Sequence, residues 1–82
     1  MEPKGQMKIE KHEKVILCKI KAKLFFENKE FSKAYALYYH AWTLEPKDIL
    51  VKSRMNEIKK MGIEIKKSDV VLALREIEVI LQ

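Results

Sequence analysis

The sequence predicts an all-α protein of about four helices, and three properties of the chain support this. Glycine and proline each occur only twice in 82 residues, which leaves too few turns for a fold of many short strands. Hydrophobic residues make up 48% and charged residues 35% of the chain, a mixture typical of amphipathic helices around a thin core. Apolar residues also recur at three- and four-residue steps along most of the sequence. We therefore expect one small helical domain.

The N-terminal part of the chain is predicted to contain a flexible segment and one long helix. Residues 1–7 lack apolar periodicity and are expected to be flexible, while residues 8–82 form the single domain. From about Met7, apolar residues recur at helical spacing as far as about Asn28. The apolar positions of this first helix are Ile9, Val15, Ile16, Ile20, Leu24 and Phe25.

A second helix is predicted after a polar break at residues 27–30. It ends near Leu44, because Pro46 cannot continue a helix and biases Glu45 away from helical backbone angles. Its apolar face consists of Phe31, Ala34, Tyr35, Tyr38, Ala41 and Trp42.

Two further helices are predicted in the second half of the chain. Asp48 favours the start of the third helix, and Gly62 suits the left-handed residue just past its end. Residues 63–67 form a connector, after which Ser68 is the expected N-cap of the fourth helix. The apolar positions are Ile49, Leu50, Met55, Ile58 and Met61 in the third helix and Val70, Leu74, Ile77 and Leu81 in the fourth.

Small and aromatic residues in the middle of the chain have a spacing that resembles the tetratricopeptide repeat, a helix–turn–helix unit of about 34 residues. Alanines stand where the two helices of that repeat cross closely, and aromatic residues fill the volume around them. The resemblance covers about residues 15–48 and implies a helical hairpin. The matching positions are Ala22, Phe25, Phe31, Ala34, Tyr38, Ala41 and Pro46.

The chain also departs from the repeat pattern at several positions. Cys18 and Lys21 replace the usual tryptophan and leucine of the first helix. Asn56 and Lys59 occupy the small and aromatic positions of a following repeat, so the third helix resembles a capping helix. We therefore expect a tetratricopeptide-like hairpin with two further helices that cover it.

The resemblance implies a non-enzymatic adaptor with a groove between the first and third helices. Several cations and one aromatic residue would line this groove and bind an acidic peptide. Some tetratricopeptide co-chaperones hold the acidic C-terminal tails of heat-shock chaperones in this way. Lys19 agrees with their pattern, whereas Lys23 and Arg54 stand where those proteins carry asparagine. The predicted peptide-binding residues are Lys19, Lys23, Phe26, Arg54 and Lys60.

The predicted fourth helix has an apolar arc wider than the stripe of roughly 100° that one core-facing side requires. One interpretation is that the helix is sandwiched in the core. The other is that it docks a partner subunit or a second copy of the chain, giving a homo-oligomer. The predicted interface residues are Leu72, Val79 and Ile80.

A net charge of +5 leaves nucleic acid as an alternative partner. Lys4, Lys8 and Lys11 would form a basic stripe for contact with RNA or a ribonucleoprotein surface. However, the aromatic residues lie at core positions and not between these lysines, so no base-stacking surface is predicted. Binding of another protein is therefore the favoured function.

A different helical fold is a further alternative. The segment 34–41 also resembles the second helix of microtubule-interacting-and-trafficking domains, which are three-helix bundles. That helix usually continues for about two more turns, which Pro46 would block. A helical bundle with an accidental match to the repeat is the remaining interpretation.

Catalysis, metal binding and a membrane span are not expected. His12 and His40 are isolated, and no glycine-rich loop is present, so we predict no enzyme activity, cofactor or metal. Cys18 replaces a large buried residue of the repeat and is expected to be a packed thiol. No apolar run approaches the ~20 residues of a membrane span. We expect a cytoplasmic protein, with the nucleus as the alternative.

Overall fold

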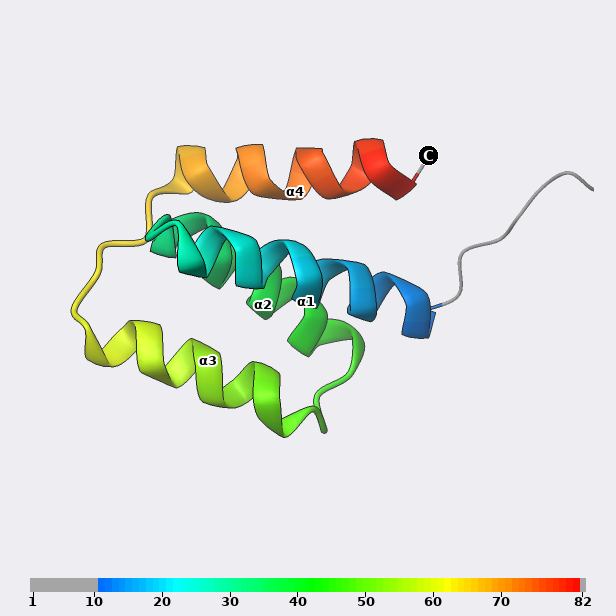
Figure 1. The fold of residues 1–82 in the computed structure, drawn as a ribbon, viewed down its shortest axis with the longest axis horizontal. Helices are drawn as coiled ribbons and strands as arrows, with labels where there is room; N and C mark the ends of the chain where they lie inside the picture. The colour runs from blue at the N-terminus through cyan, green and yellow to red at the C-terminus, as the bar shows by residue number, and fades with distance from the viewer. Residues whose placement is uncertain (1–10, 82) are drawn as a thin grey trace, which may run out of the picture.

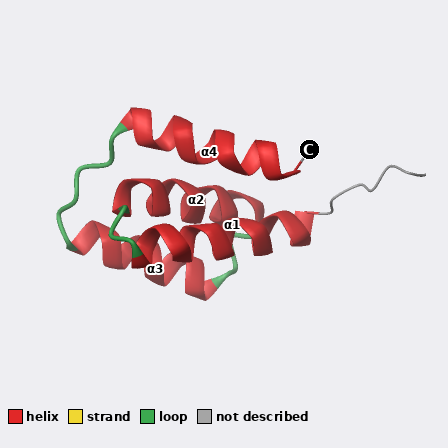
Figure 2. Cartoon of the chain, turned by 45° about the horizontal axis from the view of Figure 1, so that its top comes forward, coloured by secondary structure: helices red, strands yellow, loops and turns green. Residues whose placement is uncertain are grey.

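The computed structural model describes residues 11–81, with side chains described as far as Val79. Within this range the chain forms helices joined by short loops and contains no strand, which confirms the all-α prediction (Figure 1, Figure 2). The segment expected to be flexible, 1–7, and the predicted start of the first helix near Met7 lie outside the described residues. The helices are α1 (Lys11–Glu27), α2 (Phe31–Leu44), α3 (Ile49–Lys60) and α4 (Lys67–Leu81).

The turn between α1 and α2 uses a left-handed residue to end the first helix. The backbone N–H of Glu30 donates to the carbonyl of Phe25 at 2.8 Å, and that of Lys29 donates to Phe26 at 3.0 Å. These two bonds are the Schellman pattern, which satisfies carbonyls left open at a helix end. Lys29 has φ of +65°, although glycine is the usual residue at this position. The sequence gives no signal for this choice.

Both ends of α3 agree with the predicted start and stop signals, whereas the start of α4 does not. Gly62 has φ of +71° directly after α3, as predicted. Asp48 is the N-cap of α3, and its Oδ1 accepts a hydrogen bond from Val51 N at 3.2 Å. The prediction for Ser68 as N-cap is wrong by two positions, because α4 begins at Lys67, so Lys66 precedes the helix and Ser68 lies in its first turn.

The α1–α2 hairpin packs closely through small side chains. Ala22 of α1 and Ala34 and Ala41 of α2 are completely buried. Small residues allow two helix backbones to approach, and larger buried residues then fill the space beside the contact. The largest fully buried side chains are Leu37, Ile58, Ile77, Val15, Val51 and Cys18.

The two remaining helices lie on opposite sides of the hairpin. Both views show α4 along one side and α3 along the other, and α2 contacts all three other helices (Figure 1, Figure 2). The loop before α4 is tied to α2 because Lys66 N donates to Ser32 Oγ at 2.7 Å, which gives this buried hydroxyl a partner. This tie brings α4 back across the end of the hairpin and away from α3.

Replacing Lys29 by glycine should stabilise the protein. A side chain with a β-carbon costs roughly 1–2 kcal/mol in the left-handed region, which glycine avoids at some cost in chain entropy. We expect Lys29→Gly to raise the free energy of unfolding by about 1 kcal/mol relative to Lys29→Ala, measured by urea denaturation. Equal stability of the two variants would show that the turn carries no such strain.

Candidate functional site

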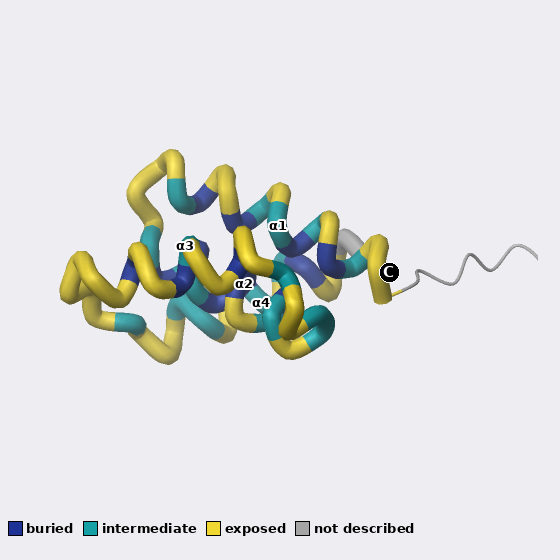
Figure 3. Tube along the Cα trace, turned by 90° about the horizontal axis from the view of Figure 1, so that it is seen from below, coloured by how far each residue is buried: buried dark blue, intermediate teal, exposed yellow. Residues whose placement is uncertain are grey.

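The outer side of α1 is an exposed apolar surface. In Figure 1 this helix lies in front of α2, between α4 and α3, and Figure 3 shows exposed turns along its outer side. Ile16, Ile20 and Leu24 are 40%, 55% and 49% exposed, and their four-residue spacing places them in one line along the helix. We call these three residues the α1 stripe. The opposite face of α1 consists of the buried residues Val15, Cys18, Ala22 and Phe25.

Ile16, Ile20 and Leu24 are among the apolar positions predicted for the first helix, but the sequence pattern does not predict a separate surface there. The structure shows that α1 has two apolar lines, one buried against α2 and one exposed. The sequence does contain a signal for a second apolar line. Ile16 comes one residue after the buried Val15. Ile20 comes two residues after the buried Cys18. A helix with apolar residues on two faces has more apolar surface than one neighbouring helix can cover.

A second exposed apolar surface lies on α4 beside α1. Lys21 Nζ lies 3.4 Å from Glu76 Oε1 and joins the two helices. Leu72 and Val79 are 50% and 67% exposed on α4, and we call these two residues the α4 shelf. The shelf borders a hollow of about 440 Å³ that it shares with Lys21, Arg75 and Glu76.

These shelf residues are two of the three predicted interface residues. Their exposure fits the expectation that α4 has more apolar surface than its core contact uses, since only Ala73 and Ile77 of this helix are fully buried among the described side chains. Ile80, the third predicted residue, belongs to α4, but its side chain lies outside the described residues.

On the other side of α1, two predicted peptide-binding residues contact each other. The guanidinium of Arg54 lies over the ring of Phe26 at 5.0 Å and also pairs with Glu57 at 2.9 Å. Phe26 is only partly exposed and packs edge to face on Phe31, with ring centroids 5.3 Å apart. Arg54 is therefore held within the protein and already has a carboxylate partner.

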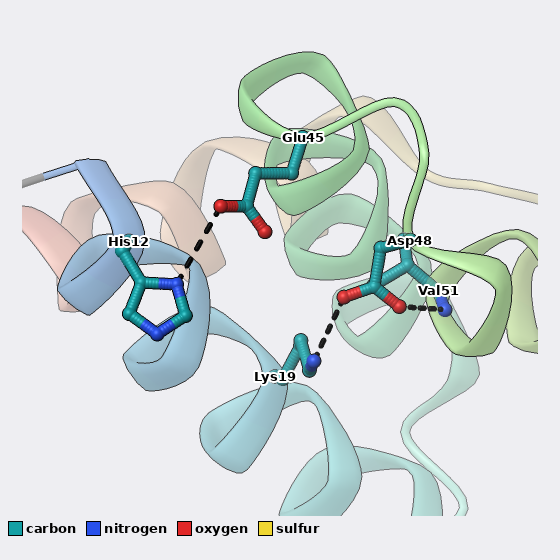
Figure 4. A network of polar contacts seen from close by, with 5 residues as sticks. All are labelled: His12, Lys19, Glu45, Asp48 and Val51. Carbon is teal, nitrogen blue, oxygen red and sulfur yellow. Dashed lines mark hydrogen bonds and ion pairs between the residues drawn. The ribbon is translucent and has the colours of Figure 1, made fainter.

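Lys19 is also occupied by an internal contact. Its Nζ donates to Asp48 Oδ2 at 2.8 Å, so one carboxylate both pairs with α1 and caps α3 (Figure 4). The hydrogen bond from Lys19, together with the backbone N–H of Val51, lowers the pKa of the Asp48 carboxyl below its ordinary value. Nearby, His12 Nδ1 lies 3.5 Å from Glu45 Oε2.

The two remaining predicted cations lie apart from each other. Lys23 is exposed on α1, and no ion pair is present for it within residues 11–79. Lys60 follows Arg54 by six residues and therefore faces a different direction on α3. It borders a shallow hollow formed by α3 alone, together with Ile49, Lys52, Ser53, Asn56 and Glu57. The structure thus does not gather the five predicted residues into one cationic clamp.

A third hollow lies on the α2 side of the molecule. It has a volume of about 390 Å³ and is almost entirely apolar. Its lining includes His40 but no lysine, arginine, aspartate or glutamate, so no charge there selects a partner. The lining residues are Tyr35, Ala36, Tyr39, His40, Thr43, Ile65, Val70 and Leu74.

Cys18 is a completely buried thiol at the centre of the hairpin, as predicted. Burial raises its pKa to about 11, because the apolar surroundings disfavour the thiolate. Within the described part of the chain, no group of three His, Cys, Asp or Glu side chains is placed to hold a metal ion.

Comparison with protein-family models, with curated proteins and with solved structures finds no match to this chain. The functional argument therefore depends on the molecule's own surfaces. Among residues 11–81, no helix combines the length and the apolar character that crossing a bilayer requires.

The double role of Asp48 predicts different costs for two substitutions. Asp48→Ala removes both the cap and the ion pair and should lower the free energy of unfolding by about 1–2 kcal/mol. Asp48→Asn keeps a capping oxygen and should cost less than about 1 kcal/mol. Both values are measured by urea denaturation at pH 7. Equal losses in the two variants would contradict the capping role.

The same ion pair predicts a pH dependence. Because folding lowers the pKa of Asp48, its stabilising effect is complete above the ordinary value of 3.8 and is lost as the pH falls through the native value. The stability difference between the natural chain and Asp48→Asn should therefore be constant near pH 7 and vanish in strong acid. A difference that persists at about pH 2 would show that charge is not its cause.

Burial of Cys18 predicts slow reaction with thiol reagents. At pH 8 the native protein should react at least roughly a hundredfold more slowly than the protein in denaturant, because the thiol must first be exposed. The double variant Cys18→Ala/Ser53→Cys moves the thiol to an exposed position on α3 and should react rapidly while folded. Equally fast reaction of the natural chain would mean that α1 opens readily.

Proposed function

We propose that this protein is a non-enzymatic interaction module that binds another protein across the α1 stripe and the α4 shelf. The observation that carries the proposal is the apolar line Ile16, Ile20 and Leu24, half exposed on the helix between α3 and α4. Contiguous exposed apolar surface on a small soluble domain marks an interaction site, whereas isolated exposed apolar residues do not. The adjoining α4 shelf extends this surface.

The geometry favours a partner subunit over a co-chaperone-like clamp for an acidic tail. Lys19 and Arg54 are already paired with Asp48 and Glu57, so a peptide carboxylate would have to share or displace a partner within the chain. Such an exchange gains little net electrostatic energy, because the charge of each cation is already partly neutralised. The apolar surface needs no such exchange.

A substitution on the stripe tests this function. Ile20→Glu places a charge at the centre of the α1 stripe, and Ile49→Glu makes the same change at an 83% exposed residue of α3 away from it. A library of displayed peptides is selected for binding to the purified natural chain. We expect the selected peptides to bind Ile49→Glu as tightly as the natural chain and Ile20→Glu at least about tenfold more weakly.

Both variants must first show the natural helical circular-dichroism spectrum. If no peptide is selected, or if the selected peptides bind Ile20→Glu without loss, the α1 stripe is not the binding surface. If the selected peptides bind the natural chain, Ile20→Glu and Ile49→Glu but fail to bind Lys60→Glu, the binding surface is instead the outer face of α3.

A further inference from the structure

We propose that the partner segment for the α1 stripe is an amphipathic helix whose apolar line is bordered by acidic residues. This inference rests on the proposed function and specifies its partner. It is carried by the shape of the surface and by the charges on its two borders.

The shape suits a helix lying along α1. The stripe follows a four-residue repeat from Ile16 to Leu24, which spans about 12 Å of helix axis. Leu17 and Leu24 lie one turn on either side of Lys21, which itself borders the hollow beside the α4 shelf. A second helix packs into such a shallow groove through residues at three- and four-residue spacing.

The borders of the stripe are basic on both sides. Lys14 and Lys21 lie on the border facing α4, because Lys21 contacts Glu76 there and Lys14 lies two turns before it. Lys19 and Lys23 lie on the border facing α3, where Lys19 reaches Asp48.

Two of these four lysines already have internal partners, and the other two do not. No ion pair is present for Lys14 or Lys23 within residues 11–79, and the same is true of Arg75 beside the α4 shelf. Each border therefore retains a positive charge that a carboxylate on a docked helix would neutralise. This complementarity selects an acidic border on the partner.

The same charges disfavour a second copy of the chain on this surface. If two α1 helices pair in opposite directions about Ile20, Glu13 of one copy lies near Glu27 of the other, and each lysine border lies against the same border of the other copy. If they pair in the same direction, Glu27 meets its own copy, and the border with Lys14 and Lys21 lies against the border with Lys19 and Lys23. Like charges directly opposed across an interface are unfavourable in both arrangements.

An anionic membrane surface matches the lysines but not the ends of the stripe. Glu13 and Glu27 continue the line of the stripe at its two ends, at three-residue spacing from Ile16 and Leu24. A flat anionic surface would bring negative charge against Glu27. A helix can carry a neutral or basic residue opposite Glu27 and acidic residues along its sides, so it fits the charges better.

Three synthetic helices test the inference. Each has 18 residues and the same net helicity; two share an apolar line at positions i, i+3, i+4 and i+7, bordered by glutamate in one and by lysine in the other. The third is glutamate-bordered with its apolar line scrambled. Fluorescence anisotropy at low salt should show binding of the first helix, at least about tenfold weaker binding of the second, and none of the third.

Charge reversal on the protein supplies the matched control. Lys14→Glu/Lys23→Glu should weaken binding of the glutamate-bordered helix by about tenfold and strengthen binding of the lysine-bordered helix. Lys52→Glu/Lys60→Glu makes the same change in charge on the outer face of α3 and should leave both affinities unchanged. Both double variants must retain the natural helical spectrum.

The outcomes separate this inference from the proposed function. Equal affinity for the two bordered helices, with loss on Ile20→Glu, overturns the acidic border and leaves the function standing. Failure of all the helices to bind, while displayed peptides still bind through Ile20, overturns the helical partner. Concentration-dependent self-association lost on Ile20→Glu, or stronger binding to vesicles containing phosphatidylserine than to any helix, also overturns the inference.

Discussion

The close approach of α1 to α2 at Ala22, Ala34 and Ala41 determines where the other helices can lie. These three alanines are completely buried, and they keep the two helix axes near each other. Since α2 also contacts α3 and α4, it is covered on three sides and supplies much of the core. In contrast, α1 has α2 behind it and helices only at its flanks, so its outer face remains open (Figure 1). The position of the exposed stripe is thus a consequence of the packing at these alanines.

The return of α4 to the side opposite α3 makes this surface wider. Ser32 accepts a hydrogen bond from the loop before α4, and Ile77 then packs into the core beside the hairpin. Had α4 paired with α3, the shelf of Leu72 and Val79 would lie away from α1. In the observed arrangement the Lys21–Glu76 ion pair joins α4 to α1, and Lys21 borders the same hollow as the α4 shelf.

Most features that the sequence predicts, such as the helix ends, depend on neighbouring residues. The contact of Lys19 that the sequence does not predict joins residues far apart in the chain. Pro46 and Gly62 gave the helix ends, and the spacing of the alanines predicted the buried face of the hairpin. The Arg54–Glu57 pair was within reach of sequence reasoning, because three-residue spacing brings helix side chains together. The Lys19–Asp48 pair joins residues 29 positions apart, so only the folded chain shows that Lys19 has a partner.

The pairing of Lys19 with Asp48 changes which interactions would contribute to the free energy of binding in the proposed complex. Covering five half-exposed aliphatic side chains, three in the α1 stripe and two in the α4 shelf, gains roughly 1 kcal/mol each. That gain of about 5 kcal/mol is near the lower end of the cost of association, about 4 kcal/mol and upward. Contributions of about 0.2–1 kcal/mol from each border charge then decide whether a complex forms. In the proposed complex Lys19 would contribute less than its charge suggests because Asp48 already neutralises it, so Lys14, Lys23 and Arg75 would select the partner.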